Sequence, residues 1–310
     1  SHDPPVRNAI RAALGDGLGL AHHLGAVGEE TDQVGGGPEP AVMLDPEIST
    51  LYLMQVWNGN ADGNGVLRLY TITGAIGSEV LTPVTFVVTP DPWSNQPPSG
   101  DLALCPQMGN PARIPCFGGS QPVFRNGTIW AAHIIYLPAD APTRSAIQWW
   151  QLAPDGDVLQ RGRLDDPSGV LFYGFPSLAV NANNDMLLGF ASFSAQQFAS
   201  CSYAYRAAAD PSGTLRTERV LKAGEDIYLG HPDGHGIRWG DYSASAVDPA
   251  DDIGLWTIQE YAATRDPATG ASRWGTWWGR VIPEAAPVDR PPPEAPARVR
   301  TPRALPPRRP

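Results

Sequence analysis

The chain has 310 residues, a net charge of −10, thirty-three glycines, thirty-three prolines and ten tryptophans. An acidic body of this kind lacks the basic stripe that nucleic-acid binding needs, which excludes nucleic acid as the expected partner. The sequence contains no run of eighteen apolar residues, so we do not expect a membrane-spanning protein. The length suits one large all-β domain or two smaller domains.

A two-strand unit recurs four times. The clearest copies are YGFPSLAVNANNDMLLGFAS (residues 173–192) and WGDYSASAVDPADDIGLWTIQEY (residues 239–261), and looser copies begin at Pro38 and Ser120. The clear copies share an aromatic residue and a glycine, an Ala-Val pair, an Asn/Asp-rich turn and a second apolar strand. Repeat periods above about forty residues are typical of propellers. We therefore predict an all-β fold, a β-propeller of four to five blades and at most six, each a four-stranded antiparallel sheet.

The chain divides into an N-terminal segment (residues 1–36), the propeller (37–286) and a tail (287–310). The four repeats are predicted at residues 40–89, 121–164, 174–221 and from 241 onward, with an irregular insertion at 90–119. The first repeat is expected to place the run AVML on its innermost strand. The last repeat has only three strands, and we expect residues 17–27 to supply the fourth and close the ring.

The tail holds nine prolines and six arginines. Such a composition cannot bury a core, so the tail is predicted to be extended and prone to the polyproline II conformation, or disordered. Its arginines can pair with acidic groups, and it is therefore the expected anchor to a protein partner or a larger assembly.

The three cysteines are Cys105, Cys116 and Cys201. The first two flank a loop that is rich in proline and glycine and poor in core residues, which gains from a covalent link. We predict a Cys105–Cys116 disulfide, with three unpaired thiols as the alternative. A disulfide indicates an oxidising compartment, so we expect an extracellular or periplasmic location.

Candidate ligand-binding residues follow from the alignment of the repeats. Residues just before the innermost strand of each blade surround one mouth of a propeller channel, where loops converge and ligands commonly bind. The residues at these positions are Glu39, Gln121, Tyr173, Phe175, Asp241 and Tyr242.

The densest group of polar residues is HPDGHGIRWGDYS, residues 231–243. Its two histidines lie four apart, but the Pro-Asp-Gly between them forbids the helix on which they would share a metal. Arg238 and Trp239, next to Asp241 and Tyr242, favour a ligand-contacting loop, and a purely structural loop is the alternative. Glu260 ends the following strand and points either to the same mouth or to solvent.

Asn58, Asn60 and Asp62 place oxygen donors at alternate positions before a glycine. Oxygen ligands around a sharp turn are what Ca²⁺ prefers, although hairpin turns are rich in the same residues. Calcium is thus the one cofactor that the sequence offers, in a role such as calcium-dependent adhesion.

The segments FPSLAVNANNDMLLGFAS and RWGDYSASAVDPADDIGLWTIQEYA resemble secreted bacterial β-propeller proteins of the sialidase-like type, most closely over residues 170–282. The resemblance implies a propeller fold. In sialidases, a Tyr–Glu nucleophile pair and an Asp acid act beside an arginine cluster, which would cast Tyr242, Glu260 and Asp241 in these roles. The chain has Ala112-Arg113-Ile114-Pro115 without the preceding aromatic residue of the family, and it has no intact Asp box.

Besides calcium-dependent adhesion, two functions remain open at this stage. The first is a non-catalytic, secreted or periplasmic propeller that acts as a binding or scaffold subunit. The second is a glycan-binding protein or sialidase-like glycoside hydrolase that works at the channel mouth, with Asp241, Tyr242 and Glu260 as the candidate catalytic residues.

Overall fold

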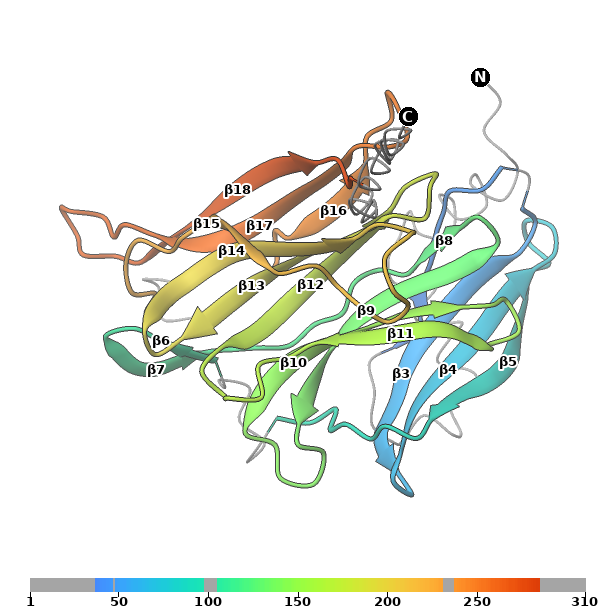
Figure 1. The fold of residues 1–310 in the computed structure, drawn as a ribbon, viewed down its shortest axis with the longest axis horizontal. Helices are drawn as coiled ribbons and strands as arrows, with labels where there is room; N and C mark the ends of the chain where they lie inside the picture. Colours follow the sequence, from blue (N-terminus) through green and yellow to red (C-terminus); the bar gives the residue numbers. More distant parts are fainter. Residues whose placement is uncertain (1–36, 47, 98–104, 231–236, 285–310) are drawn as a thin grey trace, which may run out of the picture.

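The computed structural model describes residues 37–46, 48–97, 105–230 and 237–284 (Figure 1). These residues form strands and turns and contain no helix, which confirms the all-β prediction. In this part of the chain there is accordingly no helix long and apolar enough to cross a membrane.

The strands form four principal sheets that follow one another along the chain. The first consists of β1 (Glu39–Pro40), β3 (Leu51–Ala61), β4 (Asn64–Thr73) and β5 (Val80–Thr89). The second consists of β2 (Val42–Met43), β8 (Val123–Arg125), β9 (Thr128–Leu137), β10 (Arg144–Leu152) and β11 (Val158–Leu164). The third consists of β12 (Phe172–Val180), β13 (Met186–Ser194), β14 (Gln197–Arg206) and β15 (Arg219–Lys222). The fourth consists of β16 (Ala244–Val247), β17 (Leu255–Ala263) and β18 (Arg273–Val281).

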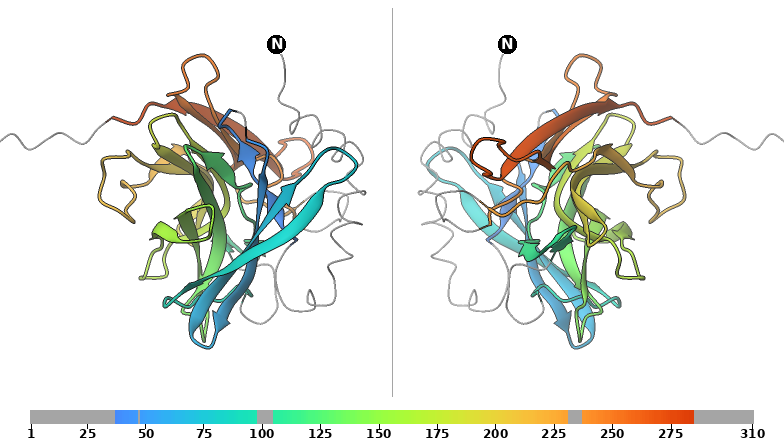
Figure 2. Two further views of the ribbon diagram at one scale, coloured as in Figure 1. Left: turned by 90° about the vertical axis from the view of Figure 1, so that its right-hand side faces the viewer. Right: turned by 90° about the vertical axis from the view of Figure 1, so that its left-hand side faces the viewer.

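Each sheet packs face to face on the next, so that the sheets fan out in chain order (Figures 1 and 2). The interfaces are apolar because the alternating residues of each strand point to opposite faces, and both faces of the second and third sheets are covered. Residue pairs that share a core cluster across the three interfaces are Leu69 with Trp150, Trp149 with Leu188, and Leu187 with Leu255.

Turns at one end of the sheets are joined by hydrogen bonds. The carboxylate of Asp45 accepts from the backbone N–H groups of Asn126 and Gly127, both at 2.7 Å. Asn126 donates from Nδ2 to the carbonyl of Ala182 at 2.9 Å, and the N–H of Ala182 donates to the carbonyl of Asp252 at 3.0 Å. Asn126 and Asp252 have φ values of 49° and 56°, a left-handed conformation that Asn and Asp tolerate better than most residues. The Asn/Asp-rich turns of the repeats therefore link all four sheets.

The opposite end of the sheets is closed by part of the insertion. A hairpin of β6 (Cys105–Gln107) and β7 (Asn110–Ile114) lies where the sequence predicted irregular structure. The predicted disulfide between Cys105 and Cys116 is present, with a Cα–Cα distance of 5.7 Å. Both cysteines are buried in an aromatic cluster that also contains Tyr136 and Phe193. The disulfide thus fixes the insertion to the core.

The first repeat differs from the prediction. The run AVML does not form one inner strand of the first sheet, because Val42 and Met43 pair in parallel with Val123 and Phe124 of β8. Successive N–H groups of an extended chain point to opposite sides. The N–H of Ala41 therefore bonds to Tyr52 of the first sheet, while that of Val42 bonds to Pro122 beside the second.

The other repeats have the predicted strands, including the three strands of the last one. The predicted closing strand (residues 17–27) and the tail (287–310) lie outside the described residues.

Candidate functional site

The loop that precedes β16 is held in place by Glu260 of β17. Glu260 Oε2 accepts a hydrogen bond from the N–H of Gly240 at 2.8 Å, and Oε1 accepts one from the N–H of Tyr242 at 2.9 Å. The side chain is buried, with 2% of its surface exposed. Burial raises the pKa of Glu260 above its usual value, while the two hydrogen bonds oppose this shift. The Glu260 carboxylate therefore fixes the loop backbone at Gly240 and Tyr242.

Gly240 and Trp239 explain the backbone conformation of the loop and its attachment to the core. Gly240 has φ +93°, and a Cβ at this position would lie 1.8 Å from Cδ1 of Phe175. Only glycine fits such a backbone conformation and so close an approach. Trp239 is buried between Tyr228 and Phe193, with ring centroids at 5.0 and 6.1 Å. The loop is thus anchored in the aromatic cluster that surrounds the disulfide.

The outer side of the loop carries charge. Arg238 Nε donates to Asp241 Oδ2 within the loop, and the Arg238 side chain is 79% exposed. The hydrogen bond with Asp241 raises the pKa of Arg238 above its usual value. An exposed pair of this kind contributes little to stability because water screens it, so both side chains are available for contact with a ligand.

An aromatic pair lies beside this charged pair. The ring of Tyr242 stacks on that of Trp274 in β18, with centroids 4.6 Å apart and planes 19° apart. Tyr242 is 56% exposed and Trp274 is 40% exposed. Exposed aromatic rings next to hydrogen-bonding groups are a surface on which a sugar ring or a planar group can stack.

The structure brings together Arg238, Asp241, Tyr242 and Glu260 from the predicted set. Trp239, Phe175 and Tyr173 are buried in the core. The phenol of Tyr173 lies beside Glu218, and its pKa is raised by burial and by that carboxylate.

Glu39 and Gln121 are exposed at the ends of the first and second sheets. Within the described residues, neither side chain forms a hydrogen bond or an ion pair with the loop that precedes β16. The histidines of residues 231–236 lie outside the described part of the chain.

The calcium candidates lie on the hairpin between β3 and β4. Asn58 Oδ1 accepts from the N–H of Asn60 at 2.9 Å, and Asn60 Nδ2 donates to Asp140 Oδ1 at 2.8 Å. Asp62 and Gly63 have φ values of 48° and 79°, as expected for a tight hairpin turn. Within the described residues, no group of three or more His, Cys, Asp or Glu side chains is placed to hold a metal ion.

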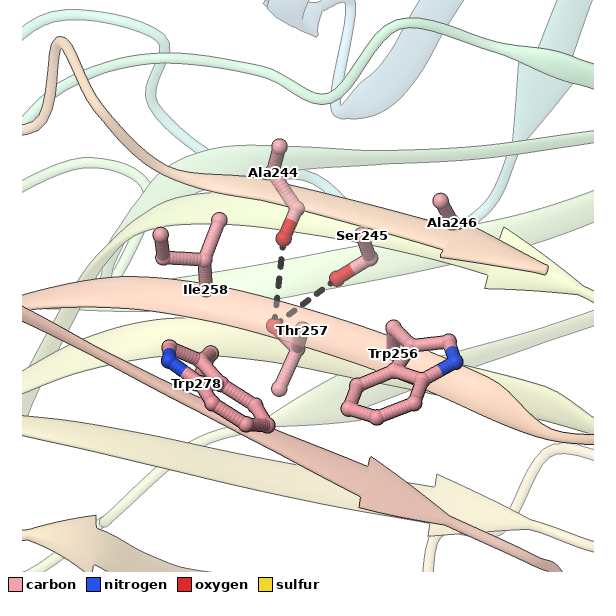
Figure 3. Close-up of a pocket in the computed structure, with 7 residues that line it drawn as sticks. All are labelled: Ala244, Ser245, Ala246, Trp256, Thr257, Ile258 and Trp278. Atoms are coloured by element: carbon pink, nitrogen blue, oxygen red, sulfur yellow. Dashed lines mark hydrogen bonds between the residues drawn. The ribbon is translucent and has the colours of Figure 1, made fainter. Parts of the chain in front are cut away.

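A hollow of about 160 Å³ lies on the outer face of the fourth sheet (Figure 3). Trp256 and Trp278 lie on either side of it, with Thr257 between the two rings and Ile258 on the side of Trp278. Thr257 Oγ1 accepts from Ser245 Oγ at 3.0 Å and lies 3.3 Å from the carbonyl of Ala244, so these polar groups bond to each other. The hollow presents apolar surface and no titratable side chain.

Trp274 is the residue of this surface that the sequence did not indicate. In the register of β17 and β18, Trp274 is opposite Ala262, and Thr276 is opposite Glu260. Residues two apart on a strand share a face, so the pairing of these strands places Trp274 on the face that carries Glu260. Without that register, nothing in the sequence relates the two positions.

No family model matches the chain, and no curated protein matches it. Three solved structures of glycoside hydrolases are similar to it, and none of these three is described as a sialidase. An endo-arabinase from Bacteroides thetaiotaomicron has 11% identity, a TM-score of 0.32, and coverage of 80% of this chain and 94% of its own. An α-L-arabinofuranosidase from Fusarium graminearum has 11% identity, a TM-score of 0.34, and coverage of 74% and 72%. An endo-1,4-β-xylanase from B. thetaiotaomicron has 11% identity, a TM-score of 0.25, and coverage of 80% and 94%.

Proposed function

We propose that this protein is a non-catalytic β-propeller that acts as a binding subunit of an extracellular or periplasmic assembly. The propeller is supported by four principal sheets that pack in chain order and by turns that hydrogen-bond from one sheet to the next. The oxidising compartment is supported by the Cys105–Cys116 disulfide.

One observation favours binding over catalysis: both carboxylate oxygens of Glu260 accept hydrogen bonds from the loop backbone. A nucleophile or general acid needs an oxygen directed at the substrate. Freeing Glu260 would break two hydrogen bonds from partly buried backbone N–H groups to a charged acceptor, at a cost of about 1.5–3 kcal/mol each. Asp241, the second candidate carboxylate, is paired with Arg238.

The partner would be held by the tail, residues 287–310, whose six arginines can bind acidic groups on a second protein. The test compares the native mass of the full chain, isolated gently from its source, with that of a chain ending at residue 286. A matched variant with all six tail arginines changed to glutamine separates charge from the extended backbone. We expect the full chain to co-purify with a partner and both variants to lose it. An unchanged complex after deletion would refute the anchoring role.

A separate assay tests the absence of catalysis. The full chain is incubated with aryl α-sialosides and aryl α-arabinosides, and no turnover above the buffer rate is expected. Turnover that Glu260→Gln abolishes, in a variant that keeps its melting temperature, would contradict the proposal and assign Glu260 to catalysis.

Glycan binding is the second candidate, and the exposed Tyr242–Trp274 stack beside Arg238 and Asp241 favours it. Trp274→Ala removes half of the stack. Trp278→Ala is a matched control, because Trp278 is an exposed tryptophan four residues along the same strand. A glycan found by array screening should lose about tenfold or more in affinity with Trp274→Ala and less than twofold with Trp278→Ala. Equal losses, or none, would exclude this surface.

A further inference from the structure

The outer edge of the fourth sheet is open. All nine residues of β18 pair with β17 on one side, and among the described strands none pairs with β18 on its other side. An edge strand directs alternate N–H and C=O groups outward, where a further strand can bond to them. The third sheet has a fourth strand, β15, at the corresponding position, so the fourth sheet is one strand shorter than its neighbour.

The sequence of β18 lacks the features that protect edge strands. The outer strands of the other sheets carry proline or charge: Pro83 in β5, two arginines in β11, and Arg219 and Lys222 in β15. Residues 274–279 read WGTWWG and hold neither. The exposed fractions of the tryptophans are 40% at Trp274, 45% at Trp277 and 64% at Trp278. An uncharged aromatic edge of this length is a site for pairing with another chain.

We propose that β18 pairs with β18 of a second copy of this chain, antiparallel, about a two-fold axis at Thr276. Residues equally far before and after Thr276 then lie opposite each other and on the same face of the sheet. Trp274 lies opposite Trp278 of the partner subunit, and the symmetry makes this aromatic pair twice. The two three-stranded sheets become one continuous sheet of twice that size.

The glycines of β18 favour this register. Trp277 lies opposite Gly275 of the partner subunit, so a large side chain meets a residue without one. Arg273 likewise lies opposite Gly279 of the partner subunit. Within its own chain, Gly275 is covered by the ring of Tyr261, because a Cβ at this position would lie 2.7 Å from Cε1 of that ring. The ring gives Trp277 of the partner subunit an aromatic surface on which to pack.

Other axes lose this match. Opposite residues must share a face of the sheet, so the axis can pass only through a residue and moves by whole residues. An axis at Trp277 would set Gly275 against Gly279 and Trp277 against its own copy. An axis at Gly275 would set Trp277 against Arg273. The glycines relieve the crowding of the larger side chains only when the axis lies at Thr276.

The area and the charges at the edge fit a weak dimer. The exposed parts of the three tryptophans amount to about 350 Å² in each copy, and with the backbone of the edge the pair buries about 1,000 Å² in total. This is the lower end for specific interfaces, so we expect a dissociation constant in the micromolar range. Two cations beside the edge already have partners. Lys222 is paired with Glu225, and Arg280 is paired with Asp248, which limits the repulsion between the copies.

Sedimentation equilibrium of the full chain tests the association. Between about 1 µM and about 500 µM, the mean mass should rise from that of one chain towards that of two. Trp278→Lys places a charge against the partner's Trp274 and should weaken the association at least about tenfold. Val88→Lys is the matched control, because Val88 is 55% exposed on β5, the outer strand of the first sheet. It should leave the association unchanged, and both variants should keep their melting temperature.

Cysteine cross-linking tests the register. Opposite residues of an antiparallel pair have Cα atoms about 4.5–5.5 Å apart, within the range of a disulfide. Thr276→Cys should therefore link two copies on mild oxidation, as a non-reducing gel can show. Trp274→Cys and Trp278→Cys should each fail to link alone and should link when the two variants are mixed. Cys201 does not compete, because it is buried.

Three results would overturn the proposal. The first is a mass that does not depend on concentration. The second is an association that Trp278→Lys leaves unchanged, which would place the contact elsewhere on the molecule. The third is cross-linking of Thr82→Cys, on the edge strand β5, as readily as of Thr276→Cys, which would show random collision in place of a defined pair.

Discussion

His133 should make the stability of this protein depend on pH in the mildly acidic range. The side chain lies on β9, is 2% exposed, and packs against Trp93 with ring centroids 5.5 Å apart. Its Nε2 accepts a hydrogen bond from Trp150 Nε1 at 3.0 Å, so the neutral ring carries its proton on Nδ1, 3.0 Å from the carbonyl of Ile134. Burial, with a smaller contribution from Arg163, lowers the pKa of His133 from 6.5 to about 4. The folded protein therefore holds a neutral histidine where the unfolded chain holds a charged one.

The sign follows from the lowered pKa. As the pH falls below 6.5, His133 becomes protonated in the unfolded chain, whereas in the folded protein it stays neutral until about pH 4. The stabilisation by neutral His133 is complete above pH 6.5 and is lost as the pH falls to about 4. A difference of 2.5 pKa units corresponds to about 3 kcal/mol, of which about 2 kcal/mol is lost by pH 5.

Urea unfolding at a series of pH values measures this loss. His133→Gln keeps an acceptor for Trp150 but does not titrate, so it serves as the reference. With a denaturant slope of about 3 kcal/mol per molar, the midpoint of the wild type should fall by about 0.7 M more than that of the variant between about pH 7.5 and pH 5. The difference between the two proteins cancels the other titrating groups. Parallel pH profiles would refute the argument that a neutral histidine is buried at this position.

Three other changes have expected outcomes. Gly240→Ala should lower the free energy of unfolding by about 3 kcal/mol, and Gly127→Ala by about 1 kcal/mol, because only the former adds a Cβ into an occupied space. Equal losses in urea unfolding would contradict the packing at the loop. Reduction of the Cys105–Cys116 disulfide, which spans eleven residues, should cost about 3 kcal/mol in urea unfolding, and an unchanged midpoint would show that the link is dispensable. Cys201 is buried, and burial raises its pKa to about 12, so the thiol should resist iodoacetamide in the folded protein and react with it in urea. Mass spectrometry measures the labelling, and rapid labelling of the native protein would disprove the burial of Cys201.

The sequence contains enough to predict the second and third sheets. Their strands are bounded by short turns whose central residues, such as Gly156 between β10 and β11, have positive φ values. Hairpins of this type depend on residues that are close in the sequence. The disulfide was predictable for a similar reason, since its cysteines flank one short loop. The hairpin between them was not, because CPQ and NPARI show no alternation of apolar and polar residues.

The candidate site was predictable in part. The repeat places Asp241 and Tyr242 before an inner strand, but the role of Glu260 depends on how the loop folds back over β17. The pairing of Val42 with the second sheet could not be predicted from the sequence either. Nothing in the run AVML specifies which edge of an extended chain meets which neighbour, and that choice is made by the packing of the sheets.

The turns that link Asp45, Asn126, Ala182 and Asp252 have a practical consequence for engineering. A peptide inserted into any one of them would disturb its neighbour as well, so this end of the molecule is a poor place for grafts. The connection from 166 to 171 lies at the opposite end of the strands and takes no part in that chain of contacts. Foreign epitopes, affinity tags or fluorophores placed there would be displayed on a rigid base without altering the joints between the sheets.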